Sequence, residues 1–144
     1  MKRHIPGLQQ VAQSESCELE GVFLVRVEWA SYRWQQGKSF FILRFVILEP
    51  KEQQERSFSG RLYCTPKALW KLHWFLRDFG YDTDLLGRDE VDERALVGLR
   101  GVARVSHTTL NGHSFLNLDG FAPAGEWEEL AAPVRQGEAM GHDL

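Results

Sequence analysis

Residues 65–80 read TPKALWKLHWFLRDFG and carry the clearest helical pattern in the chain. Thr65 suits the N-cap of a helix and Pro66 its first position, while Gly80 can end the helix in the left-handed conformation. At about 100° per residue, one face of this helix is apolar. The residues on that face are Ala68, Leu69, Leu72, Phe75, Leu76 and Phe79. The sequence therefore predicts one amphipathic helix over residues 65–79.

Strand-like runs lie on both sides of the helix. Three precede it, at residues 22–34, 40–48 and 56–64, and two follow it, at residues 99–109 and 113–121. Asn111-Gly112 is a strong signal for a two-residue hairpin turn between the last two runs. The register set by this turn pairs Val105 with Leu118 and Arg104 with Asp119.

The alternation in the first strand puts Phe23, Val25, Val27 and Trp29 on one face, which we take as the core face, while the register of the first hairpin, and so which face is exposed, stays open. The same pattern in the second strand places Phe41, Leu43, Phe45 and Ile47 in the core. The order of elements is β-β-β-α-β-β, which is the order of the OB-fold, a Greek-key barrel that commonly binds single-stranded nucleic acid or oligosaccharide. We therefore expect a mainly β protein, a five-stranded OB-fold barrel with one helix between strands three and four.

Charge and composition divide the chain of 144 residues into three segments. We expect a flexible N-terminal segment over residues 1–19, an OB-fold domain over residues 20–123 and an acidic, disordered tail over residues 124–144. The net charge is −3, yet the tail alone holds five acids and one base, so residues 1–123 carry +1. A generally basic surface, the usual electrostatic footprint of a nucleic-acid-binding protein, is therefore absent.

Chemistry-bearing motifs are missing from the sequence. Cys17 and Cys64 have no paired spacing, and the five histidines do not recur at metal-ligand spacing. The acids between residues 89 and 93 are expected to form a solvated loop. No nucleophile elbow, zinc-protease motif or phosphate loop occurs. We therefore expect a protein that is not an enzyme and needs no metal or cofactor, and the lack of a long apolar run predicts a cytoplasmic protein without membrane contact.

Aromatic and basic residues interleave along the strands, as binding to single-stranded nucleic acid requires, because bases stack on rings while cations neutralise phosphates. The candidate phosphate contacts are Arg26, Arg44, Arg61 and Arg104. The candidate stacking residues are Tyr32, Trp34, Phe40, Tyr63 and Phe115, and Lys38 joins Trp34 beside the first hairpin turn. The same pattern also fits an ordinary sheet in which Phe40 is buried under a loop or the tail.

Trp70 and Trp74 lie one helical turn apart, away from the apolar stripe and beside Lys67 and Lys71. Two exposed tryptophans would form an apolar patch of the kind that marks a contact surface. One alternative is that another part of the chain covers them. The other is a protein–protein or homodimer interface on the outer face of the helix. The acidic tail is a second segment that could recruit a protein partner.

Four local patterns resemble single-stranded DNA-binding OB-fold proteins of phages and bacteria. They are Glu20-Gly21-Val22-Phe23, Gly37-Lys38-Ser39-Phe40, the segment from Lys71-Leu72 to Phe79-Gly80, and the segment from Leu99 to Val105. Together they span residues 20–122. The resemblance implies an OB barrel that binds single-stranded DNA with little sequence preference, RNA being the related possibility. A protein-interaction module on the same barrel stays open as the alternative function.

Overall fold

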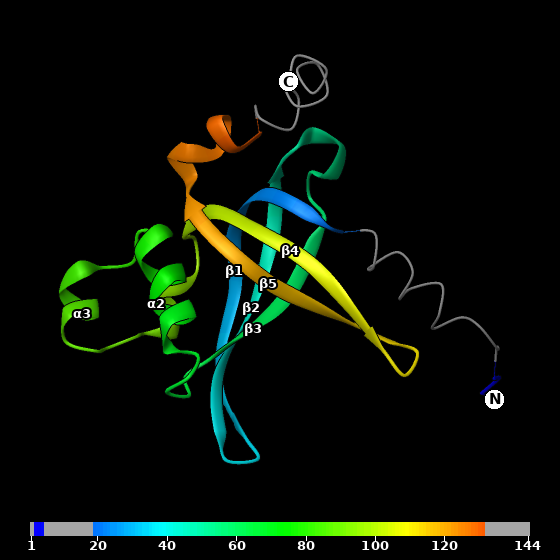
Figure 1. Ribbon diagram of the computed structural model, residues 1–144, viewed down its shortest axis with the longest axis horizontal. Coiled ribbons are helices and arrows are strands. Elements are labelled where there is room, and N and C mark those ends of the chain that lie inside the picture. Colours follow the sequence, from blue (N-terminus) through cyan, green and yellow to red (C-terminus); the bar gives the residue numbers. More distant parts are fainter. Residues whose placement is uncertain (1, 5–18, 132–144) are drawn as a thin grey trace, which may run out of the picture.

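The computed structural model describes residues 2–4 and 19–131. Five antiparallel strands form one strongly bent sheet in the order β3-β2-β1-β4-β5, with the helices of the segment between β3 and β4 on one side of it (Figure 1). The strands are β1 (Gly21–Gln35), β2 (Lys38–Glu49), β3 (Ser57–Tyr63), β4 (Arg100–Leu110) and β5 (His113–Pro123). The helices are η1 (Lys51–Gln53), α2 (Leu69–Asp78), α3 (Thr83–Gly87), α4 (Glu93–Leu96) and η2 (Ala124–Glu126). The predicted mainly β architecture of five strands is confirmed.

The hairpin between β4 and β5 turns at Asn111 and Gly112, as predicted. Both residues have positive φ, at 52° and 79°, which a type I′ turn requires. Val105 pairs with Leu118 as expected, but Arg104 pairs with Gly120 and not with Asp119. A bulge between Arg104 and Val105 accounts for this shift, since an extra residue on one strand displaces the register beyond it.

A second bulge changes which side chains of β1 face the core. Phe23, Val25 and Val27 are buried as predicted, but the register with β2 shifts between Val27 and Trp29. Trp29 consequently pairs with Arg44 and lies on the outer face of the sheet. The prediction that Trp29 belongs to the core is therefore wrong, because the extra residue reverses the inward and outward positions of β1 beyond it.

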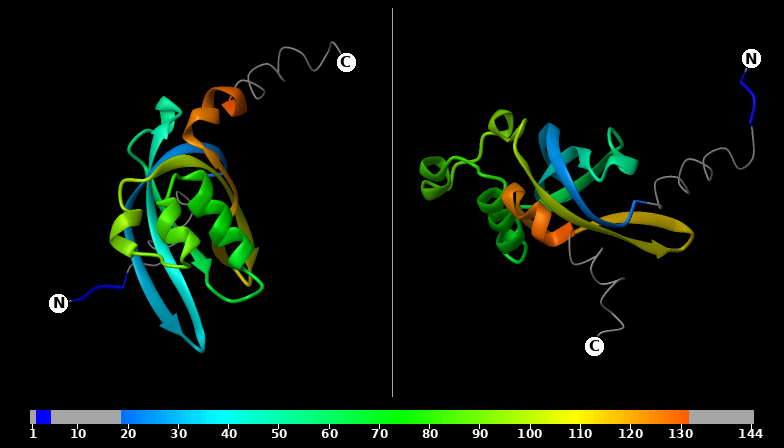
Figure 2. Two further views of the ribbon diagram at one scale, coloured as in Figure 1. Left: turned by 90° about the vertical axis from the view of Figure 1, so that its left-hand side faces the viewer. Right: turned by 90° about the horizontal axis from the view of Figure 1, so that it is seen from above.

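The core lies between the concave face of the sheet and helix α2. Leu72, Phe75 and Leu76 of α2 are buried, and the Phe75 ring contacts Phe45 of β2 and Phe121 of β5. The view in Figure 2 (left) shows α2 across one end of the bent sheet. Leu69, predicted on the apolar face, is exposed at the first turn. The helix thus closes one end of the core, and fewer of its residues are buried than the apolar pattern of the sequence indicates.

The ends of α2 follow the predicted boundaries only in part. Gly80 has a φ of 78°, and the Gly80 and Tyr81 amides donate to the carbonyls of Arg77 and Leu76, so the predicted glycine stop is confirmed. At the other end the helix begins at Leu69, and no side chain caps it. Thr65 instead accepts, through its carbonyl, a hydrogen bond from the Ala68 amide in a preceding turn.

The sheet is not closed into a barrel. Its two edge strands are β3 and β5, and in the described part of the chain no ladder of hydrogen bonds joins them. They do approach at one point, where a Cβ atom on Gly60 would lie 2.7 Å from the Leu118 side chain. The predicted barrel is therefore not formed. The sheet is open, and the Leu118 side chain on one edge packs against the Gly60 backbone on the other.

The segment after β5 departs from the predicted disordered tail. Residues 124–131 are helical, and Trp127 is buried. Burial of a large aromatic ring stabilises such a segment. A composition rich in Ala, Gly and Glu does not indicate that one Trp will be buried. The remainder of the predicted tail, and the predicted flexible N-terminal segment apart from residues 2–4 and Leu19, lie outside the described residues. Leu19 is buried in the core.

Candidate functional site

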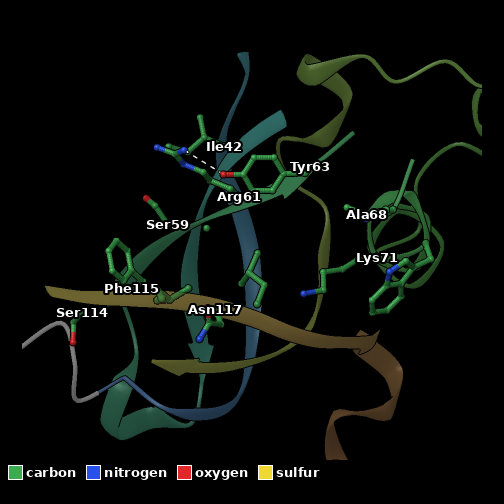
Figure 3. Close-up of a pocket in the computed structure, with 14 residues that line it drawn as sticks. Ile42, Ser59, Arg61, Tyr63, Ala68, Lys71, Ser114, Phe115 and Asn117 are labelled. Atoms are coloured by element: carbon green, nitrogen blue, oxygen red, sulfur yellow. Dashed lines mark hydrogen bonds between the residues drawn. The ribbon is translucent and has the colours of Figure 1, made fainter. Parts of the chain in front are cut away.

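A groove of about 740 Å³ lies between the two edge strands, near the first turn of α2. One wall is formed by β3, the other by β5, and the beginning of α2 lies across one end (Figure 3). Its polar and aromatic lining comprises Ser59, Arg61, Tyr63, Lys67, Trp70, Lys71, Ser114, Phe115 and Asn117. The groove lies between β3 and β5, the two edge strands that would have to pair to close the sheet into the predicted barrel.

The β3 wall carries Ser59, Arg61 and Tyr63 on the outer face of the sheet, because alternate residues of a strand point to the same side. The Arg61 guanidinium donates to the Tyr63 hydroxyl at 3.4 Å and lies 4.6 Å from the centre of the Phe40 ring. This cation–π contact orients the guanidinium beside the groove. Arg61 and Tyr63 were both predicted as site residues, and both line the groove.

The helical end of the groove carries two lysines and a tryptophan. Lys67 lies in the turn before α2, and Trp70 and Lys71 lie in its first turn. The Lys71 ammonium nitrogen is 5.7 Å from the centre of the Trp70 ring, and Trp70 is 61% exposed. Figure 3 shows Lys71 extending from the helix toward the strands. This end therefore offers positive charge next to an exposed aromatic ring.

The β5 wall carries Ser114, Phe115 and Asn117. Phe115 is 53% exposed, so its ring is available to a ligand. The Asn117 amide donates to the Thr108 hydroxyl at 2.8 Å, which fixes its orientation across the β4–β5 hairpin. Phe115 was predicted as a stacking residue, and the groove brings it opposite Arg61 and Tyr63 (Figure 3).

The charge of the groove differs from that of the chain. Arg61, Lys67 and Lys71 line it, while none of the lining residues in the described structure is Asp or Glu. The whole chain carries a net charge of −3. Positive charge is thus concentrated in this groove together with three aromatic rings. A polyanion with flat rings, of which single-stranded nucleic acid is the common example, matches this combination.

Other predicted site residues lie elsewhere. Phe40 is only 4% exposed, covered by the Arg61 guanidinium and by the Tyr63 ring at 5.3 Å, so it supports the groove and cannot stack on a base. Arg44 lies on the outer face near Trp29, 5.8 Å from its ring centre. Arg26 is exposed further along the same face, opposite Val46. The structure does not bring Arg26 or Arg44 into the groove.

Tyr32 occupies the opposite face of the sheet from the one predicted. It pairs with Phe41, and its ring contacts the Phe41 ring at 5.3 Å. The bulge that turns Trp29 outward has turned Tyr32 to the core side, so the prediction of Tyr32 on the outer face is wrong. Trp34 and Lys38 are exposed near the tip of the β1–β2 hairpin. Their predicted position beside the turn is confirmed, outside the groove.

Arg104 lines a different groove, beside Trp74, Asp119 and Leu130. Trp74 itself is half-buried: its indole N–H donates to Asp78 at 2.8 Å, and its ring meets Phe121 edge to face at 5.8 Å. The alternative in which another part of the chain covers the tryptophans therefore holds for Trp74, whereas Trp70 is exposed and stacks on Trp74 with 6.1 Å between the ring centres. Strand β5 supplies the cover.

The polar and aromatic groove residues that the sequence interpretation left out of the binding site are Ser59, Lys67, Trp70, Lys71, Ser114 and Asn117. Lys67 and Lys71 flank Trp70 on the sequence, which is a local basic and aromatic pattern. Their relation to Arg61 and Phe115 depends on three separate elements meeting. No short sequence pattern encodes that meeting.

No protein-family model matches the chain, and no curated protein matches it significantly. In the described residues, no helix has both the length and the apolar character needed to cross a lipid bilayer. No group of three or more His, Cys, Asp or Glu side chains in that part of the chain is arranged to hold a metal ion.

Proposed function

We propose that this protein binds single-stranded DNA without catalysis, in the groove between β3 and β5. The observation that carries the proposal is the groove lining, which combines Arg61, Lys67 and Lys71 with three aromatic rings and includes no carboxylate among the described residues. In a chain with a net charge of −3, the electrostatic attraction for phosphate is therefore local. Each base stacked on a ring would contribute about 1–3 kcal/mol of binding free energy.

The roles of the side chains follow from their positions. Bases would stack on Trp70 and Phe115, the two exposed rings at the helical end and on the β5 wall. Arg61, Lys67 and Lys71 would neutralise phosphates between them. Ser59 of the β3 wall would donate a hydrogen bond to a phosphate or sugar oxygen of the DNA, a contact that positions a strand without reading its sequence.

The fold assignment to the OB type belongs to the same proposal. The strand order β3-β2-β1-β4-β5, with a helix between β3 and β4, is what results when a five-stranded OB barrel is opened between β3 and β5. The approach of Gly60 to Leu118 across that opening supports this relationship.

Duplex DNA has stacked, inward-facing bases, so the aromatic rings of the groove favour binding of the single strand.

Fluorescence titration of the protein with an oligothymidine tests the proposal. We expect quenching of tryptophan emission with saturable binding at low salt, weaker binding at moderate salt and much weaker binding of a duplex of the same length. An oligouridine of equal length measures the preference for DNA over RNA. Absence of binding at low salt, or preference for the duplex, would overturn the proposal.

The alternative function, a dimer or protein-interaction module on the outer face of α2, predicts a different outcome. Trp70 would then be covered by a partner, and Trp70→Asp would turn a dimer into a monomer. Light scattering on the wild-type chain and on this variant separates the two functions, because a DNA-binding monomer keeps its mass when Trp70 is replaced.

A further inference from the structure

The second half of β1 has an open edge. Strand β4 pairs with β1 only over residues 21–26, whereas β2 continues along β1 to the turn at Gln35. Within the described structure, no strand lies on the other side of residues 29–35. An unpaired strand edge is a template for the backbone of another chain, unless something covers it.

The register identifies which groups point off this edge. Gln35 and Lys38 flank the two-residue turn, so they form a hydrogen-bonded pair, and the alternate positions Tyr32 and Trp34 belong to pairs that do not exchange hydrogen bonds. Their N–H and C=O groups therefore point away from β2. The Tyr32 N–H does so, since it donates to the Glu93 carboxylate of α4. A side-chain acceptor thus already occupies the place of a neighbouring strand.

A pocket of about 530 Å³ adjoins this edge and differs in charge from the groove. Its apolar lining comprises Tyr32, Phe41, Cys64, Leu69, Leu72 and Val91. Three carboxylates, those of Asp89, Asp92 and Glu93, complete it, and no Lys or Arg is among its lining residues in the described chain. An apolar side chain would fit the pocket, and a neighbouring cation would meet the carboxylates.

We infer that the edge of β1 at Trp34 binds an extended basic segment of a partner protein by strand addition. The backbone of the segment would pair with the N–H and C=O groups of Trp34 and with the C=O of Tyr32, whose N–H already donates to Glu93, as in other complexes formed at a sheet edge. Its apolar side chains would enter the pocket, and its Lys or Arg side chains would meet Asp89 and Glu93. This surface lies apart from the β3–β5 groove, with no lining residue in common.

Fluorescence anisotropy with a short labelled peptide of alternating lysine and valine tests the inference. We expect saturable binding at low salt, and none of a peptide of alternating glutamate and valine. Trp34→Pro removes an outward N–H without removing a bond to β2, and should weaken binding roughly five- to tenfold relative to Trp34→Ala, which keeps the N–H. Asp89→Asn with Glu93→Gln should weaken it roughly fivefold.

The matched charge control is Glu52→Gln with Glu128→Gln, two exposed carboxylates outside the pocket. This control should bind the peptide as the wild type does. Equal binding by Trp34→Pro and Trp34→Ala, or an equal loss in the control, would overturn the inference. A concentration-dependent dimer that Trp34→Pro dissociates would also overturn it, because the edge would then pair with a second copy of the chain.

Discussion

Gly60 of β3 lies so close to Leu118 of β5 that a Cβ atom on the glycine would be 2.7 Å from both the Cγ and the Cδ1 of the leucine. Both residues are buried. The two edges of the open sheet therefore meet through one leucine side chain packed on bare backbone. The groove that we propose as the DNA site is built around this contact, since both residues also line it.

Gly60→Ala should destabilise the protein. The added methyl group forces Leu118 or the β3 backbone to move, and overpacking of this kind costs about 1–3 kcal/mol. Urea unfolding measures the free energy of unfolding. Gly125→Ala is the control, because no atom lies near a Cβ at that position. Equal stability of the two variants would show that the edges of β3 and β5 do not pack as described.

Phe115→Ala should weaken binding of oligothymidine by about 1–3 kcal/mol, the value of one base–ring stack. Because the Phe115 ring is largely exposed, the free energy of unfolding should stay within about 0.5 kcal/mol of the wild type. Leu110→Ala removes another exposed side chain from the same hairpin and should leave the affinity unchanged. An equal loss of affinity in both variants would mean that the DNA binds at the tip of the β4–β5 hairpin and not in the groove.

The salt dependence of DNA binding should reflect the number of cations in the groove. Each phosphate contact with a single strand contributes a slope of about −0.7 to log K against log salt, so the three cations predict a slope of about −2. Lys71→Gln should reduce the magnitude of the slope by about 0.7. Lys51→Gln, at an exposed position on η1, should leave it unchanged. A slope that Lys71→Gln does not alter would exclude Lys71 from phosphate contact.

Phe40→Ala should lower the free energy of unfolding by about 3–5 kcal/mol, as is typical when a buried Phe is truncated. Trp34→Ala, at a residue that is 69% exposed, should lower it by no more than about 0.5 kcal/mol. Thermal or urea unfolding of both variants makes the comparison. A mild effect of Phe40→Ala would mean that Phe40 is an exposed stacking residue after all.

Alkaline pH should act on Cys64. Burial raises the pKa of the Cys64 thiol above its ordinary value of 9.0, while a hydrogen bond with Ser39 partly lowers it. A raised pKa means that folding favours the neutral thiol, so this contribution to stability is present below pH 9 and is lost as the pH rises through the folded-state pKa. Cys64→Ala should therefore flatten the fall of stability above pH 9, measured by urea unfolding at several pH values. An unchanged fall would remove Cys64 as a cause.

Local signals in the sequence predicted the elements well. Asn111-Gly112 specified the last hairpin, and Gly80 specified the end of the helix, because in each case a residue that tolerates positive φ stands where the backbone needs it. Alternation predicted the core face of β2 through Phe41, Leu43 and Phe45. Each of these predictions depends on a few neighbouring residues, which a single sequence displays directly.

The errors come from features that alternation does not encode. One extra residue in β1 sends Trp29 outward and Tyr32 inward, and no residue in that stretch marks the bulge. Phe40 looks like an exposed ring of the outer face until Arg61 and Tyr63 are seen to cover it. The groove itself requires β3, α2 and β5 to meet in space. The sequence thus predicts the components of the site better than their arrangement.

Two double variants with equal charge change test the central claim most directly. Arg61→Gln with Lys71→Gln removes two cations from the groove, and Arg33→Gln with Arg44→Gln removes two exposed cations from β1 and β2 outside it. Oligothymidine affinity is measured for both by fluorescence titration at low salt. The groove variant should bind roughly tenfold more weakly than the wild type, and the other variant much as the wild type does. Equal weakening of both variants, or a larger loss in the second, would contradict the assignment of the groove as the DNA site.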